Sequence, residues 1–121
     1  MIIKEILILI LLIVGLKSFS QNKVARATIE VDGVCMMCKS RIEKACLSAK
    51  GVKYANWDVN THQLKLIYNN KKIDLDAISN RVAKAGHDTK TVIATPEDYA
   101  NVHPCCMYRD DAIKETHKEA K

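Results

Sequence analysis

Two cysteines three positions apart are the residues of this sequence with the clearest chemistry. Cys35 and Cys38 follow a segment, residues 26–32, in which apolar residues occupy alternate positions, as in a half-buried strand. A helical pattern begins at Lys39, so we expect the first thiol in a loop and the second in the first helical turn. The unpaired N–H groups at a helix start favour thiolate over thiol. Two such neighbouring thiolates can bind a soft metal ion or cycle through a disulfide.

A second group of candidate ligands lies near the other end of the sequence. His103, Cys105 and Cys106 fall within four residues, and Pro104 disfavours helical geometry at His103. A vicinal disulfide or a pair of exposed thiols is the alternative interpretation. We predict a second soft-metal site, or ligands that fold back onto the first pair. The fifth cysteine, Cys46, lies on an apolar helical stripe and is expected to be a small buried hydrophobe.

The ligand chemistry indicates which ions such thiolates would bind. Two sulfur atoms fit two-coordinate Cu(I) or Hg(II) best, and Zn(II) or Cd(II) is also compatible with thiolate ligands. A disulfide between Cys35 and Cys38 would close a very short loop and would hardly stabilise the fold. Metal binding is therefore the favoured interpretation of this pair.

The first 20 residues have the features of a secretory signal peptide. Lys4 precedes an apolar run over residues 6–16, and Ser18 and Ser20 form a small-x-small cleavage site. This run is shorter than the ~20 residues of a membrane span, and an uncleaved anchor is the alternative. We therefore expect residues 1–20 to be a signal peptide and the mature protein to be secreted across the inner membrane into the periplasm.

The composition excludes some classes of function. The chain has 121 residues and a formal net charge of +5, and its lysines are spread along the sequence. Without a basic cluster or interleaved aromatic residues, we expect no nucleic-acid partner. The five cysteines comprise one C-x-x-C pair, one vicinal pair and one single residue, and this arrangement is not typical of a disulfide framework.

Residues 24–94 predict a βαββαβ order of elements. Helices are expected over about 38–50 and after an N-cap at Asp74, ending at Gly51 and Gly86 respectively. Alternating apolar residues predict three strands, and β-branched residues predict a fourth over 89–94. This order is the α+β ferredoxin-like arrangement, a sandwich in which two helices cover one face of a four-stranded antiparallel sheet.

The motif and the order of elements resemble the heavy-metal-associated domain. This family includes copper chaperones, the metal-binding domains of copper-exporting P-type ATPases and the periplasmic mercury-binding protein. The resemblance covers residues 24–94, where C-x-x-C opens a helix and Ala85-Gly86 closes the second helix. It implies that Cys35 and Cys38 bind the metal. It also places His87 beside the metal, as a third ligand or a hydrogen-bonding partner.

The sequence departs from the family pattern in the loop before the first cysteine. The family usually has Gly-Met-x-Cys-x-x-Cys, whereas only Val34 separates Gly33 from Cys35. We expect Val34 to take the place of the usual buried methionine, or Met36 or Met37 to turn inward. This departure affects the geometry of the loop more than the identity of the ligands.

Three segments follow from these observations. They are a signal peptide over residues 1–20, a heavy-metal-associated domain over 21–94, and a C-terminal extension over 95–121 that holds the His/Cys cluster and includes a short helix after Thr95. The candidate metal ligands are Cys35, Cys38, His87, His103, Cys105 and Cys106.

The predicted function is binding rather than catalysis. We expect a monomeric protein that captures Cu(I) or Hg(II) and transfers the ion by thiolate ligand exchange. The resemblance implies a metal-transporting membrane protein as the partner, either a P-type ATPase or another transporter. One alternative is a thiol–disulfide oxidoreductase that uses the C-x-x-C pair, although the element order argues against a thioredoxin-like fold. The other is a metal-sensing or transporter-accessory module.

Overall fold

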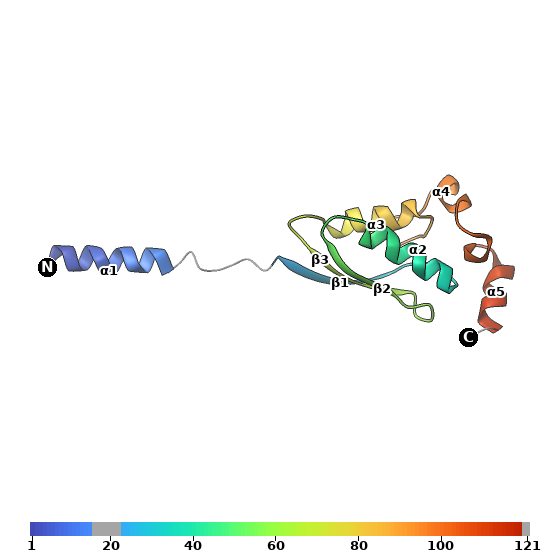
Figure 1. Ribbon diagram of the computed structural model, residues 1–121, viewed down its shortest axis with the longest axis horizontal. Helices are drawn as coiled ribbons and strands as arrows, with labels where there is room; N and C mark the ends of the chain where they lie inside the picture. Colours follow the sequence, from blue (N-terminus) through green and yellow to red (C-terminus); the bar gives the residue numbers. More distant parts are fainter. Residues whose placement is uncertain (16–22, 120–121) are drawn as a thin grey trace.

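The computed structural model describes residues 1–15 and 23–119 and has an antiparallel sheet with helices on one of its faces (Figure 1). The strands are β1 (Val24–Glu30), β2 (Val52–Trp57) and β3 (Gln63–Asn69), in the spatial order β1-β3-β2. Helices α2 (Met36–Leu47) and α3 (Leu75–Lys84) pack against this sheet. The predicted α+β ferredoxin-like class is confirmed.

The fourth strand is a correction to the sequence prediction, because the sheet formed by the described residues has three strands. After a single bridge from Thr89 to Val31, the chain turns away. The Thr89 N–H donates to the carbonyl oxygen of Val92 (2.8 Å), and the Val92 N–H donates to the Thr89 hydroxyl (2.9 Å). These local bonds satisfy backbone groups that a strand would have paired.

Both helices that support the candidate site begin and end at identifiable residues. The Asp74 carboxylate accepts a hydrogen bond from the Ala77 N–H (2.7 Å), which confirms the predicted N-cap of α3. Gly86, two residues beyond the end of α3, has a φ of +99°, in the region that glycine adopts readily. Helix α2 begins at Met36, two residues earlier than predicted, with Cys35 as its extended N-cap residue.

The hydrophobic core lies between the sheet and these two helices. Its fully buried side chains include Trp57, Leu64 and Leu66 from the sheet and Ile42, Ile78 and Val82 from the helices. The indole N–H of Trp57 donates to the Val31 carbonyl oxygen (3.0 Å), so the largest core side chain keeps its one polar group satisfied.

The C-terminal extension packs onto the end of the domain where α2 begins (Figure 1). It contains α4 (Pro96–Ala100), a single 3₁₀ turn, η1 (Pro104–Cys106), and α5 (Asp111–Glu119). Helix α4 begins with Pro96 at its first position, as the sequence predicted, and the Thr95 hydroxyl caps it. Three side chains of the extension, those of Val102, Cys106 and Tyr108, are buried in the same cluster as the domain core. The domain boundary at residues 94 and 95 stays a prediction.

The N-terminal segment forms helix α1 (Ile2–Gly15), which stands apart from the domain in Figure 1. Among the described residues, no helix combines the length and apolar character needed to cross a membrane. The expected cleavage site at residues 18–20 lies outside the described residues, so the signal peptide also stays a prediction.

Candidate metal centre

The start of α2 brings the first two thiols together. Cys35 has an extended backbone (φ −143°, ψ 172°), while Cys38 lies in the first turn of the helix. Their Sγ atoms are 3.3 Å apart, and both side chains are buried. The Val34 N–H lies 3.5 Å from the Cys38 sulfur and donates to it. The loop and first-turn positions expected from the sequence are therefore confirmed.

The loop before Cys35 packs closely on the core. A Cβ atom on Gly33 would lie 3.0 Å from two ring carbons of Trp57 and 3.1 Å from Cys38 Cβ. Val34 is buried in the core cluster, whereas Met36 and Met37 are 63% and 45% exposed. Of the two expectations for the missing methionine, the structure therefore has Val34 in the interior.

The C-terminal extension brings two further thiols to the same place. Cys35 Sγ lies 3.5 Å from Cys105 Sγ and 3.3 Å from Cys106 Sγ, and the latter two atoms are 4.0 Å apart. Cys35, Cys105 and Cys106 form a group whose sulfur atoms all lie within 4.8 Å of one another. Cys38 contacts Cys35 directly and also interacts with Cys106. Of the two predicted arrangements, the structure has the one in which the C-terminal segment folds back and brings its two thiols to the first pair.

The environment of these thiols distinguishes Cys35 from the other three. Burial acts to raise the pKa of the Cys35 thiol, but hydrogen bonds from the Cys38 backbone N–H and from the neighbouring thiols outweigh it and lower the pKa below its ordinary value. Burial raises the pKa of Cys38, Cys105 and Cys106. Of the four thiols, Cys35 is therefore the one that loses its proton most readily. We call these four residues the thiol cluster.

Two soft side chains flank the thiol cluster at its exposed edge. Cys105 Sγ lies 3.6 Å from the sulfur of Met37 and 3.2 Å from Nδ1 of His103. His103 has an extended backbone (φ −61°, ψ 144°), as expected for a residue before proline, and its Nδ1 accepts the Cys105 N–H. The imidazole thus contacts the cluster through Cys105. Its role as a metal ligand stays a prediction.

His87 is buried in the core. Its ring nitrogens do not belong to the group of possible metal-binding atoms formed by Cys35, Cys105 and Cys106. Its Nδ1–H donates to the Asp32 carbonyl oxygen (2.8 Å), and its ring stacks on that of Tyr108 at 5.4 Å between centroids. Burial lowers the pKa of His87, so the imidazole is neutral. Nε2 is buried without a hydrogen-bond partner among the described residues. The predicted role of His87 at the metal site stays a prediction.

Cys46 is fully buried on the core side of α2, as expected. Burial raises the pKa of its thiol to about 12. It is therefore an uncharged core side chain, separate from the thiol cluster.

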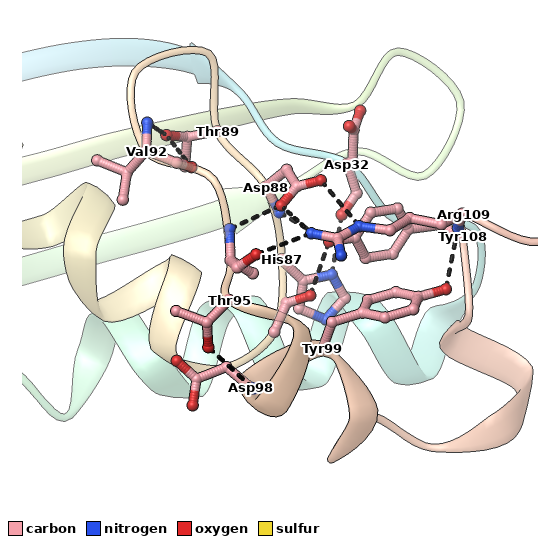
Figure 2. A network of polar contacts seen from close by, with 12 residues as sticks. Asp32, His87, Asp88, Thr89, Val92, Thr95, Asp98, Tyr99, Tyr108 and Arg109 are labelled. Atoms are coloured by element: carbon pink, nitrogen blue, oxygen red, sulfur yellow. Dashed lines mark hydrogen bonds and ion pairs between the residues drawn. The ribbon is translucent and has the colours of Figure 1, made fainter.

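Two residues that follow the vicinal cysteines fasten the extension to the loop after α3 (Figure 2). The Tyr108 hydroxyl donates to the Gly86 carbonyl oxygen (2.7 Å) and accepts from the Asp88 N–H (2.9 Å). The Arg109 guanidinium binds both carboxylate oxygens of Asp88, at 2.7 and 3.3 Å, and donates to the Ala94 carbonyl oxygen (3.0 Å). We call this pair of contacts the Tyr108–Arg109 latch.

Sequence reasoning missed the latch. The signal available was weak: Tyr99, Val102 and Tyr108 are apolar or aromatic residues in an otherwise polar segment. In the structure, Arg109 lies over the ring of Tyr99, 4.2 Å from its centroid, and Tyr99 meets Tyr108 edge to face. Such spacing is a reason to expect that an extension packs on the domain.

Comparison with known proteins finds similar sequences and folds among copper-transporting ATPases and MerP. The copper-exporting P-type ATPase of Staphylococcus aureus (strain Newman) is 37% identical over 68 residues, covering 54% of this chain. The Cu(I)-loaded N-terminal domain of a potential copper-translocating P-type ATPase from Bacillus subtilis is 26% identical, with a TM-score of 0.53, and the match covers 55% of this chain and 85% of that one. Oxidized MerP from Ralstonia metallidurans CH34 shares the fold at 22% identity and a TM-score of 0.53, covering 55% and 94%. No protein-family model matches the chain.

The fold and the thiol cluster define a small domain suited to binding a soft metal ion through sulfur. With the likenesses above, they bear out the resemblance of this part of the chain to the heavy-metal-associated domain, a family of metal-binding modules that are not enzymes. The chain spans about 8% of the length of the curated ATPases that it matches. The likeness therefore concerns the domain alone.

Proposed function

We propose that the protein captures Cu(I) or Hg(II) in the periplasm and transfers the ion to a partner by thiolate ligand exchange. The observation that carries this proposal is the convergence of four thiols, from Cys35, Cys38, Cys105 and Cys106, at the start of α2. Sulfur ligands select soft ions. Cys35 and Cys38 are the primary ligands, and Cys105 and Cys106 share the same ion.

Transfer in this proposal is a sequence of ligand substitutions. An incoming thiol gives its proton to solvent and forms a metal–sulfur bond, and one original metal–sulfur bond then breaks as its thiolate takes up a proton. The oxidation state of the metal does not change. The exposed edge of the cluster, at Cys105, supports such exchange because a partner can reach it there. A fully enclosed four-ligand site would instead suit a structural ion.

The proposed partner is a metal-transporting membrane protein. Support comes from the matched relatives, which are a copper-exporting ATPase and the N-terminal domain of a potential copper-translocating ATPase. The periplasmic location rests on the signal-like features of residues 1–20, a basic residue followed by an apolar run.

The test is a metal titration of the full chain, purified without oxygen. The wild-type protein is expected to bind Cu(I) in competition with a colorimetric chelator. The double variant Cys35→Ser, Cys38→Ser is expected to lose at least about a hundredfold in affinity. Cys46→Ala is the matched control, since this thiol is buried elsewhere on α2, and it should bind as the wild type does. An unchanged affinity in the double variant would contradict the assignment, and insulin reduction by the same sample would favour an oxidoreductase.

A further inference from the structure

The C-terminal extension occupies the approach to the Cys35 sulfur atom. Cys105 and Cys106 both lie within 3.5 Å of its sulfur atom, and the η1 turn that carries them packs against the start of α2. A partner thiol would have to take the place of one of these two sulfur atoms to reach an ion held by Cys35 and Cys38. The extension therefore provides internally the ligands that a partner would provide from outside.

The contacts that hold the extension in place are separate from the sulfur atoms. In the latch, the Tyr108 hydroxyl binds the backbone of Gly86 and of Asp88. The Arg109 guanidinium binds the carboxylate of Asp88 (Figure 2). The guanidinium and carboxylate form a two-bond pair, which fixes orientation as well as distance. The latch therefore joins the loop after α3 to the residues two and three positions beyond Cys106.

A second attachment holds the part of the extension that precedes the cysteines. A Cβ atom on Gly86 would lie 2.4 Å from Val102 Cγ1 and 2.8 Å from the Asp98 carbonyl oxygen. The extension therefore lies directly on the glycine that follows α3. Val102 and Tyr108, on either side of Cys105 and Cys106, are both buried. The vicinal cysteines are thus held from both sides.

We infer that the Tyr108–Arg109 latch positions Cys105 and Cys106 on the Cys35–Cys38 pair, so that the extension is a clamp that slows the release of a bound ion. Transfer to a partner then requires this clamp to open. The inference rests on the proposed function and adds a control on the exchange step. In the closed form the ion keeps bonds to sulfur atoms of both segments. In the open form Cys105 and Cys106 have left the ion and taken up protons, and an incoming thiolate replaces them.

The experiment measures how fast an excess of chelator removes Cu(I) from the loaded full chain. Arg109→Met breaks the pair with Asp88, and Tyr108→Phe removes only the hydroxyl. Each is expected to speed release by about tenfold, the lower end of the effect seen when groups that orient metal ligands are removed. Arg109→Lys keeps the charge but not the two-bond geometry and should restore part of the slow release.

Arg81→Met is the matched control. Like Arg109, Arg81 joins two segments of the chain through its guanidinium, which donates to the Ala45 carbonyl oxygen (3.0 Å) and to the Ser48 hydroxyl (2.9 Å). These contacts join α3 to the end of α2, away from the thiol cluster. Arg81→Met should release Cu(I) at the wild-type rate. With Hg(II) in place of Cu(I), the thiolate-to-metal absorption should weaken in Arg109→Met and stay unchanged in Arg81→Met.

A double-mutant comparison separates positioning from a general loss of structure. Cys105→Ser, Cys106→Ser should release Cu(I) at least as fast as Arg109→Met, and adding Arg109→Met to it should cause no further acceleration. Release at the wild-type rate from Arg109→Met and Tyr108→Phe would overturn the inference. The inference would also be overturned if Arg109→Met accelerated Cu(I) release equally in the wild-type background and in Cys105→Ser, Cys106→Ser. Failure of the wild type to bind Cu(I) or Hg(II) at all would instead overturn the proposed function.

Discussion

Gly33 lies where the loop that carries Cys35 crosses the indole ring of Trp57. In a Gly33→Ala variant, the added methyl group would meet Trp57 at 3.0 Å and Cys38 Cβ at 3.1 Å. Trp57 is fixed by its bond to Val31, so we expect the loop to move. The loss of unfolding free energy should be about 1–3 kcal/mol, the usual cost of overpacking, and can be measured by urea denaturation of the reduced protein. A stability equal to that of the wild type would show that the loop adapts.

His87 gives a pH-dependent prediction for the metal-free, reduced protein. Burial lowers its folded pKa, so the unfolded chain takes up a proton first as the pH falls through its ordinary value of ~6.5. The unfolded state then binds more protons than the native state, and stability falls with pH below that value. His87→Phe keeps the stacking on Tyr108 but cannot be protonated.

The measurement is urea denaturation at about pH 7.5 and about pH 5.5, on either side of the ordinary histidine pKa. The loss of stability between the two should be smaller in His87→Phe than in the wild type. His103→Gln, which changes an exposed histidine, should lose as much as the wild type. Equal losses in all three proteins would mean that His87 does not control this pH dependence.

The position of each candidate residue in the fold was easier to predict than the contacts between candidate residues that are far apart in the sequence. Cys35 and Cys38 could be placed at a helix start because the change from alternating to helical spacing is local. Cys46 could be placed in the core because it lies on an apolar stripe. The contact between Cys35 and Cys106 joins residues 71 positions apart. The segment that carries Cys106 is held by the packing of Val102 against Gly86 and by the Asp88–Arg109 pair, and neither contact has a local pattern in the sequence.

At the scale of elements, the second half of the domain shows why propensity misled the prediction. Residues 89–94 are rich in β-branched types, which favour strands, yet Thr89 and Asp88 bind nearby backbone N–H groups instead. Residues 89–94 therefore form no strand, because side-chain hydrogen bonds to their backbone compete with the pairing of this segment along β1. Both helices were predicted from their apolar stripes; the start of α3 was placed correctly by its Asp74 cap, whereas α2, which has no side-chain cap, begins two residues earlier and ends three residues earlier than predicted.

The connection between α3 and α4 gives a prediction with a matched control. Gly86 and Gly51 follow α3 and α2, with φ values of +99° and +103°. Replacing either by alanine should cost about 1–2 kcal/mol of unfolding free energy from backbone strain alone. Gly86→Ala should also displace the extension, because its Cβ would meet Val102 at 2.4 Å. Gly51→Ala would instead meet Lys72.

The readout is metal release together with urea denaturation. Gly86→Ala should be the less stable variant and should release Cu(I) faster than the wild type. Gly51→Ala should lose stability but keep the wild-type release rate. Equal release rates for the two variants would argue that the position of the extension does not depend on its packing against Gly86.

At the scale of the whole molecule, an ion bound by the thiol cluster would join two distant parts of the chain. Cys35 and Cys106 are separated by 71 positions, and a crosslink closing a loop of that length contributes about 4 kcal/mol in the chain-entropy model. Addition of Hg(II) should therefore raise Tm more in the wild type than in Cys105→Ser, Cys106→Ser. The extra rise should be on the order of 20 °C.

Differential scanning calorimetry of the two proteins, with and without Hg(II), measures this difference. Cys46→Ala is again the control and should show the full rise. The same rise in the wild type and in Cys105→Ser, Cys106→Ser would mean that the ion binds within the first segment alone.

The separation of the thiols along the chain also has a consequence during synthesis. At ~5–20 residues per second, the 71 positions between Cys35 and Cys106 take a ribosome roughly 4–14 s to translate. During that interval every nascent molecule carries Cys35 and Cys38 without their C-terminal neighbours. An ion or an oxidant that meets the chain then encounters Cys35, Cys38 and Cys46 but neither of the vicinal cysteines. The Cys35–Cys38 pair is therefore made before the vicinal cysteines, and the four-sulfur state can form only after the C-terminal extension has been made.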